Sequence, residues 1–380
     1  MKKKILVVAL VLALIVSAFA GCGGGEGDAD TVKLGGIAPL TGELAVYGVP
    51  TNNGIQLAID EINANGGVLG KQIEFFSYDE KGDATEAVNA YNKLVQNDGV
   101  CAIIGDVTSG NTVAVAQQSV ADNIPIITPT GTSVDITKQG ENVFRACFID
   151  PYQGQTMASY AQKELGAKTA AILYNTSDDY SIGCVAAFEE QAKALGLQIV
   201  AKEGYKKGDV DFKAQLTTIA GKSPEVLFVP VYAEDVALIT VQAKTVGVKA
   251  TFLGVDGWDG VVSKIDASNI DAVEGALFTN HYSPQGTEQK LVDFIANYTE
   301  KFGEAPISFS ALGYDAVYMM VQAIEAAGST DSQAIIDALK AVDFAGTTGT
   351  MKFDENRNPV KSAFIITIKG GEYEFVKEFK

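Results

Sequence analysis

The sequence predicts an α/β protein with two lobes, each built on a doubly wound parallel sheet. Short β-branched runs alternate with segments of helical periodicity along most of the chain, which is typical of parallel sheets covered by helices. The alternation stops near Asp150-Pro151 and then starts afresh. Single hydrophobic cores stop growing at about 250 to 300 residues, so a chain of 380 residues is expected to form two.

The elements follow in order from these patterns. Strands are predicted at 32–37, 73–78, 100–104 and 124–127 in the first lobe, and at 169–174, 198–202 and 226–229 in the second. Ile55, Ile59 and Ile62 recur at helical spacing, and Asn65-Gly66-Gly67 marks the end of a helix over 53–64. A helix over 152–165 opens the second lobe.

After residue 280 the pattern changes, because three helices are predicted without intervening strands, at 288–302, 308–327 and 332–342. These helices need a sheet to cover, and the first lobe is expected to host them. The chain would then cross between the lobes near residues 150, 280 and 349, which makes a hinge of three segments. The expected lobes are 31–150 plus 280–348 and 151–279 plus 349–380. Residues 350–353, 363–369 and 373–376 predict a terminal hairpin with its turn at Gly370-Gly371.

The first thirty residues have the pattern of an export signal. Lys2, Lys3 and Lys4 precede an apolar run over 5–16, which is too short for a good membrane span. Phe19-Ala20-Gly21-Cys22 resembles a bacterial lipobox, in which cleavage precedes a lipid-modified cysteine, with Phe19 in place of the more usual leucine. We therefore predict a signal peptide over 1–21, lipidation of Cys22 and a flexible tether over 22–30. A plain secreted protein and an uncleaved anchor are the alternatives.

Composition narrows the classes of function. Loss of residues 1–21 removes three lysines and no acid, so the formal charge changes from −18 to −21, which argues against nucleic acid and anionic lipid as partners. His281 is the only histidine, which excludes most hydrolase triads and most zinc sites. No cofactor or metal is expected. Cys101, Cys147 and Cys184 lie in apolar segments and are predicted to be buried free thiols rather than a disulfide or metal site.

Two hydroxyl-rich loops follow neighbouring strands of the first lobe, where ligands bind in open α/β sheets. One contains Ser109 and Asn111 just before a helical segment, and the other contains Thr130, Thr132 and Ser133. Hydroxyl groups beside a helix N-terminus suit an anion such as a carboxylate, and the Thr130 carbonyl could accept a hydrogen bond from an ammonium. Ordinary helix capping by these side chains is the alternative.

The remaining candidates are an acid and three tyrosines. Asp256 follows a predicted strand of the second lobe between two glycines and could neutralise an ammonium, with a turn role as the alternative. Tyr47, Tyr180 and Tyr232 are predicted to lie in loops and to form walls with a polar hydroxyl, with ordinary packing as the alternative.

Several segments together resemble one family. They are 34–42 (LGGIAPLTG), 54–70 (GIQLAIDEINANGGVLG), 103–105, 127–129 and 252–254. These segments resemble the leucine/isoleucine/valine-binding proteins, which are type I periplasmic solute-binding proteins of amino-acid ABC importers. The resemblance covers nearly the whole chain from about residue 31, and it implies two α/β lobes that close over a ligand by hinge motion.

The resemblance also implies roles for individual residues. Ser109 and Thr132 would bind the ligand carboxylate, and the Thr130 carbonyl, Thr132 and Asp256 would bind the ammonium. Asp256 stands where the branched-chain binders have glutamate, so its carboxylate reaches one methylene less far. The expected pocket walls are aromatic and favour an apolar or aromatic ligand side chain; they are Tyr47, Tyr180, Tyr232, Trp258 and Phe309. Trp258 is absent from the family pattern and is expected to narrow the pocket.

The sequence therefore predicts a monomeric receptor outside the cytoplasm that binds an α-amino acid, branched-chain or otherwise apolar, and delivers it to the permease subunits of an ABC importer. Its only contact with the membrane would be the lipid anchor. A sensory or regulatory ligand-binding domain of the same fold is one alternative. An extracellular hydrolase using Asp256 and Asp259 is the other.

Overall fold

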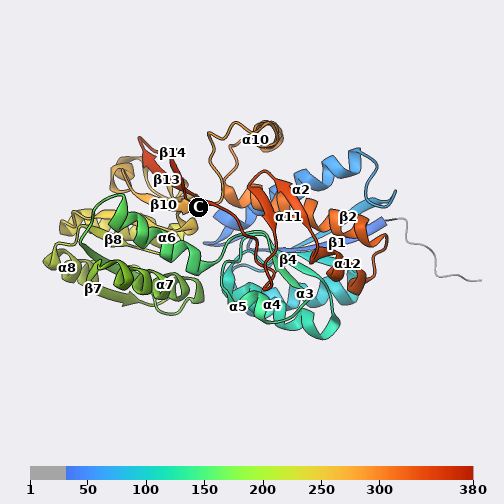
Figure 1. Ribbon diagram of the computed structural model, residues 1–380, viewed down its shortest axis with the longest axis horizontal. Coiled ribbons are helices and arrows are strands. Elements are labelled where there is room, and N and C mark those ends of the chain that lie inside the picture. The colour runs from blue at the N-terminus through green and yellow to red at the C-terminus, as the bar shows by residue number, and fades with distance from the viewer. Residues whose placement is uncertain (1–30, 380) are drawn as a thin grey trace, which may run out of the picture. The chain divides into compact units, whose positions relative to one another are not determined.

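The computed structural model describes residues 31–379. The predicted signal peptide, Cys22 and the tether lie outside the described residues. Residues Val32–Lys380 form one compact unit, which contains a sheet of five strands and a sheet of seven strands with helices packed against both (Figure 1). The predicted fold class, an α/β protein with two mostly parallel sheets, is confirmed.

The first sheet has the strand order β2-β1-β3-β4-β5. Its strands are β1 (Thr31–Ala38), β2 (Gln72–Asp79), β3 (Ala102–Ile104), β4 (Ile126–Thr128) and β5 (Val143–Arg145). The pairs β1–β3, β3–β4 and β4–β5 are parallel. Every residue of β3, β4 and β5 is buried, as expected for parallel strands covered on both faces.

Helices from two distant parts of the sequence cover the first sheet (Figure 1). They are α2 (Ala45–Ala64), α3 (Ala84–Lys93), α4 (Ser109–Asp122), α5 (Asp135–Lys138), α10 (Gln289–Phe302), α11 (Ser308–Ala327) and α12 (Ser332–Leu339). Two glycines let α2 and α11 touch backbone to backbone. A Cβ atom at Gly54 would lie 2.0 Å from the Ser310 carbonyl oxygen, and one at Gly313 would lie 2.4 Å from that of Thr51.

The second sheet has the order β14-β13-β10-β9-β8-β6-β7. Its strands are β6 (Thr169–Asn175), β7 (Gln198–Tyr205), β8 (Val226–Phe228), β9 (Thr251–Gly254), β10 (Leu277–Asn280), β13 (Ala363–Lys369) and β14 (Glu372–Phe379). Strands β6 to β10 pair in parallel, whereas β13 joins β10 and β14 in antiparallel fashion. The predicted terminal hairpin is therefore present as β13 and β14.

The helices of the second lobe are α6 (Asp150–Lys163), α7 (Asp179–Leu195), α8 (Lys213–Lys222) and α9 (Ala233–Val246), with short 3-10 turns at Asp256–Trp258, Val261–Ser263 and Ala267–Ala272. Helix α7 shows how the sequence sets their ends. The Asp178 carboxylate accepts the Ser181 backbone N–H at its start, and Gly196 adopts a left-handed conformation at its end.

Several predictions about elements need correction. Residues 350–353 do not belong to the terminal hairpin, because β12 (Gly349–Lys352) pairs with β11 (Asp343–Gly346) in a separate sheet. Strand β5 was not expected, and α2 begins at Ala45 rather than at residue 53. Tyr47 and Tyr180 consequently lie in the first turns of α2 and α7 rather than in loops, while Tyr232 precedes α9 as expected.

The three cysteines of the described region are free, as predicted, but Cys101 is only partly buried. Burial raises the pKa of the Cys147 thiol to about 12 and that of Cys101 to about 11, so both are protonated and unreactive. Across residues 31–379, no helix is long and apolar enough to cross a membrane.

Candidate functional site

A small cavity lies where strands of both sheets end. It is lined by Val107, Thr108, Ser109, Thr130, Thr132, Tyr180, Tyr232, Asp256, Gly257 and Phe309, and it encloses about 10 Å³. The lining residues 107–109 and 130–132 follow β3 and β4, Phe309 lies on α11, and Tyr232 and Asp256 follow β8 and β9. This is the edge of an open α/β sheet at which ligands bind. The structure thus brings together the two hydroxyl-rich loops and the acid that the sequence singled out.

Ser109 is the first residue of α4, where helix N–H groups and the helix dipole favour an anion. Its hydroxyl oxygen accepts the Ser133 backbone N–H at 3.2 Å, which ties the two loops together. The N-cap of α4 is Thr108 and makes no side-chain capping bond, while Asn111 donates to the Glu80 carboxylate at 2.8 Å. Capping by Ser109 or Asn111, the alternative considered above, is therefore wrong.

Arg145 on β5 holds the second loop in place. Its guanidinium donates to the Gly131 carbonyl at 2.8 Å and to the Ser133 carbonyl at 2.7 Å. The Thr132 carbonyl between them accepts the Asp150 backbone N–H at 3.1 Å. Three successive carbonyls are thus bonded to the protein, whereas among residues 31–379 nothing donates to the carbonyl of Thr130. That carbonyl remains available to a ligand.

Arg145 is fully buried, and burial lowers the pKa of its guanidinium. A buried guanidinium that bonds only carbonyl oxygens keeps its full positive charge close to the loop. The loop therefore combines hydroxyl donors with a nearby buried cation, and it also lies beside the buried Asp150 carboxyl, whose pKa is raised by burial. The Ser133 hydroxyl accepts the Asp135 N–H at 3.3 Å in a local turn, but the N-cap of α5 is Val134, which makes no side-chain capping bond.

Asp256 is the acid of the second lobe, and it is 2% exposed. Its Oδ1 accepts the Tyr180 hydroxyl at 2.6 Å, and its Oδ2 lies 3.0 Å from Nε2 of His281. Its backbone N–H donates to the Gln153 side chain at 2.9 Å. Burial and the Asp256 carboxylate raise the pKa of Tyr180, so the phenol stays a donor.

Aromatic rings form one continuous wall beside the cavity. Tyr180 stacks on Tyr232 with centroids 5.0 Å apart, Tyr232 contacts Tyr47 at 5.6 Å, and Tyr47 contacts Phe309 at 4.6 Å. Tyr47 also connects the lobes, because its hydroxyl donates to the Gly257 carbonyl at 2.5 Å and accepts the Ala233 N–H at 2.6 Å. Tyr47 does not line the small cavity, but it lines the larger pocket that adjoins the cavity.

Two expectations about site residues are wrong. Trp258 does not line the cavity, because its ring is fully buried in the second-lobe core and its Nε1 donates to the Val229 carbonyl at 2.7 Å. Asp259 also lies away from the cavity, since its carboxylate accepts the Asn280 side chain and the Ser308 N–H at 3.1 and 2.8 Å. A hydrolase that uses Asp256 and Asp259 together has no common substrate space.

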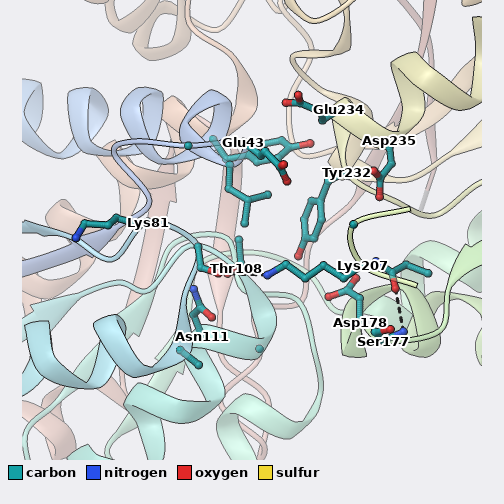
Figure 2. A pocket seen from close by; sticks show the side chains of 18 of the residues that line it. Glu43, Lys81, Thr108, Asn111, Ser177, Asp178, Lys207, Tyr232, Glu234 and Asp235 are labelled. Atoms are coloured by element: carbon teal, nitrogen blue, oxygen red, sulfur yellow. Dashed lines mark hydrogen bonds between the residues drawn. The ribbon is translucent and has the colours of Figure 1, made fainter. Parts of the chain in front are cut away.

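A larger pocket of about 530 Å³ adjoins the cavity and shares Thr108 and Tyr232 with it (Figure 2). Charged residues of both lobes line this pocket, among them Lys81, Asp178, Lys207 and Asp235. Lys207 donates across it to the Gly82 carbonyl at 3.4 Å. We interpret this pocket as the solvent-facing mouth of the cavity. Within the described chain, no cluster of three metal-ligating side chains occurs.

Three residues that hold the site residues in position, without lining the cavity, were not predicted from the sequence. Arg145 could have been found from the sequence, because it is a single cation within the apolar segment Val143 to Cys147. Gln153 carried none, because a glutamine in the first turn of a helix is ordinary. His281 was noted only as an isolated histidine.

Comparison with known proteins agrees with this geometry. Residues 31–372 match the family described as periplasmic binding protein, and the chain belongs to that family of solute-binding proteins. It is 32% identical over 330 residues to the leucine-, isoleucine-, valine-, threonine- and alanine-binding protein of Pseudomonas aeruginosa, over 86% of this chain and 87% of that protein.

Two solved structures are also similar. The leucine-binding protein LivK of Thermotoga maritima superposes with a TM-score of 0.85 at 34% identity, over 92% of this chain and 99% of that one. The branched-chain amino acid binding protein LivJ of Streptococcus pneumoniae, in complex with isoleucine, also superposes with a TM-score of 0.85 at 34% identity, over 91% of this chain and 99% of that one. These matches confirm the family and fold that the sequence predicted.

Proposed function

We propose that this protein is a membrane-tethered receptor outside the cytoplasm that binds an α-amino acid, branched-chain or otherwise apolar, and delivers it to an ABC importer permease. One observation carries the proposal. Hydroxyl groups beside a helix N-terminus in one lobe and an acid in the other face the same cavity. A carboxylate suits the first and an ammonium the second, and an α-amino acid presents both at fixed spacing.

The orientation of the ligand follows from the donors and acceptors. The carboxylate would accept hydrogen bonds from Ser109 and Thr132, close to the buried Arg145 charge. The ammonium would donate to the Thr130 carbonyl, the Thr132 hydroxyl and Asp256. Charge-assisted hydrogen bonds of this kind are strong, and exclusion of water strengthens them further.

The ligand side chain would lie against apolar groups. Val107, Phe309 and the ring of Tyr232 line the remaining wall, and none of them offers a charge. This favours leucine, isoleucine, valine or a similar residue. Apolar pockets separate ligands that differ by one methylene by only about 1 to 3 kcal/mol, so we expect several of these amino acids to bind.

Binding requires the lobes to move. A cavity of about 10 Å³ has room for about one water molecule, far less than an amino acid needs. The bonds from Tyr47 to Gly257 and Ala233 hold the lobes together, and they must break or lengthen when ligand enters. We propose that the lobes, 31–150 with 280–348 and 151–279 with 349–380, rotate about three segments near 150, 280 and 349.

The export signal and Cys22 would determine where the receptor is located in the cell envelope. We propose that the signal over 1–21 is removed, that Cys22 is lipidated, and that the tether over 22–30 holds a monomeric receptor near its permease. Tethering raises the effective concentration at the permease without any new contact. The family and its amino-acid-binding relatives support a location outside the cytoplasm.

A thermal-shift panel of the twenty amino acids on tag-free residues 23–380 tests the proposal. Leucine, isoleucine or valine should raise the melting temperature in a saturable way, since a ligand at one hundred times its Kd stabilises the folded state by about 2.7 kcal/mol. Two compounds serve as controls, 4-methylpentanoate, which lacks the ammonium, and isopentylamine, which lacks the carboxylate. Both should raise the melting temperature much less than leucine does. If no amino acid shifts the transition and native mass spectrometry finds no co-purified ligand, amino-acid binding is wrong.

A further inference from the structure

The acid of the ammonium subsite is held at both of its oxygens by other side chains. Tyr180 donates to Oδ1 at 2.6 Å, and the His281 ring nitrogen Nε2 lies 3.0 Å from Oδ2. Asp256 is one methylene shorter than glutamate, so its carboxylate has less freedom to follow a ligand. The direction in which it presents its charge therefore depends on these two partners.

His281 is itself fixed in position. It follows β10 directly, and its backbone N–H donates to the Asn280 side chain at 2.7 Å. Its ring is fully buried and stacks on Phe148, with centroids 3.7 Å apart and planes 22° apart. Phe148 lies just before α6 and His281 just after β10, so the stack joins two of the three proposed hinge segments.

The imidazole makes one side-chain hydrogen bond. Nδ1 is buried and has no partner within residues 31–379, and Nε2 contacts only Asp256. An Asp–His pair is also half of a hydrolytic triad, but a triad needs a hydroxyl or thiol on the second ring nitrogen. No such group bonds Nδ1 in the described chain, so the pair is not catalytic machinery.

The charge of the ring decides what it does for Asp256. Burial lowers the pKa of His281 to about 4, against the opposing effect of the Asp256 carboxylate. At neutral pH the ring is therefore uncharged and donates Nε2–H. A lysine or arginine here would form an ion pair with Asp256 and compete with the ligand ammonium. A neutral donor orients the carboxylate and leaves its negative charge for the ligand.

We propose that His281 is a positioning residue that holds Asp256 in the orientation that receives the ammonium of the amino acid. The inference rests on the proposed function, because it assumes that an amino acid occupies this cavity. It goes beyond that function by assigning ammonium recognition to a residue that does not line the cavity.

The test compares two ligands in two variants by calorimetric titration. Leucine carries the ammonium, whereas 4-methylpentanoate keeps the same side chain and carboxylate without it. In His281→Phe, which keeps an aromatic ring over Phe148, the Kd for leucine should rise about 10- to 100-fold. The Kd for 4-methylpentanoate, measured directly or by competition, should change less than about threefold. His281→Gln, which retains an N–H donor, should recover part of the loss.

Equal weakening of both ligands would show a merely structural role, and unchanged leucine affinity would show no role; either result overturns the proposal. In an Asp256→Asn background, His281→Phe should have no further effect on leucine. If His281→Phe weakened leucine binding in the Asp256→Asn background as much as it does in the wild type, His281 would act independently of Asp256.

A measurement on the unaltered protein covers the case in which the variants fail to fold. His281 is the only histidine in the chain, so ¹⁵N-histidine labelling of a tag-free protein gives one imidazole in the NMR spectrum. We expect a neutral ring protonated at Nε2 between pH 5 and 8, with shifts that change on leucine addition. A cationic ring, the Nδ1–H tautomer, or shifts insensitive to bound leucine would overturn the proposal. If no amino acid binds the wild type, the proposed function fails, whereas the tautomer still tests the Asp256–His281 contact.

Discussion

Replacement of Asp256 by asparagine removes one charge and almost no volume at a residue that is 2% exposed. The asparagine amide cannot accept hydrogen bonds at the position of its nitrogen, so either Tyr180 or His281 loses its partner. More importantly, the ligand ammonium would enter a closed site without its counter-charge. Truncation of one partner of a buried charge pair lowers binding by about 2 to 5 kcal/mol, which is about a 30- to 5,000-fold rise in Kd.

Isothermal titration with leucine measures this change, and Ser109→Ala is the matched comparison. Ser109 supplies one hydroxyl to the carboxylate, and loss of one charged hydrogen bond lowers binding by about 1.5 to 3 kcal/mol, or about 10- to 150-fold. Circular dichroism should confirm that both variants are folded. Equal affinity of wild type and Asp256→Asn would refute the placement of the ammonium at this acid.

Three further predictions concern stability and closure. Arg145→Met removes the guanidinium from the Gly131 and Ser133 carbonyls, which then keep only the Cys147 thiol at 3.2 Å and the Ile136 N–H at 3.3 Å as donors; it should lower the unfolding free energy by about 2 to 5 kcal/mol in urea. The exposed Lys138→Met should change the unfolding free energy by less than about 1 kcal/mol, and equal effects of the two variants would contradict the bracing role. Tyr47→Phe removes the hydroxyl between Gly257 and Ala233 and should shift the ligand-free protein to more open conformations in small-angle scattering, whereas an unchanged profile would show that the hydroxyl does not hold the lobes. Burial raises the pKa of Glu80 from 4.5 to about 7, beside the buried Asp106 carboxyl, whose pKa is raised by burial and by Glu80. The resulting stability is fully present below pH 4.5 and is lost as pH rises through 7, so wild type should lose more unfolding free energy than Glu80→Gln across this window, and parallel pH profiles would contradict the assignment.

The sequence was sufficient to predict the parts of the site that follow strands. Ser109, Thr130 and Thr132 follow the buried strands β3 and β4 within five residues, Asp256 follows β9, and the edge rule for parallel sheets places such residues together. Those four residues do line one cavity. The arrangement needs only strand order and direction, which the alternation of elements already specifies.

Other features could not be read from local pattern. Gly48 and Pro50 interrupt the helical periodicity near residue 47, so the first turns of α2 were hidden and Tyr47 was assigned to a loop. Trp258 lies two residues beyond Asp256, but a 3-10 turn at Asp256–Trp258 directs its ring into the core. Such a change of direction depends on the turn, which composition does not encode.

The contacts that hold the site residues in position were the least predictable part of the site. Arg145 and Gln153 act through contacts with residues 12 to 126 positions away in the chain, and sequence patterns report mainly on neighbours within a few turns. His281 and Asp256 are 25 residues apart and follow the neighbouring strands β10 and β9. These contacts became visible only when the strands were placed in order.

A crystal structure of residues 23–380 with bound leucine tests the central claim most directly. The account predicts a closed protein with the leucine carboxylate within hydrogen-bond distance of the Ser109 and Thr132 hydroxyls, and the ammonium in contact with Asp256 and the Thr130 carbonyl. Leucine bound outside this cavity, or bound within it with its carboxylate facing Asp256, would contradict the account.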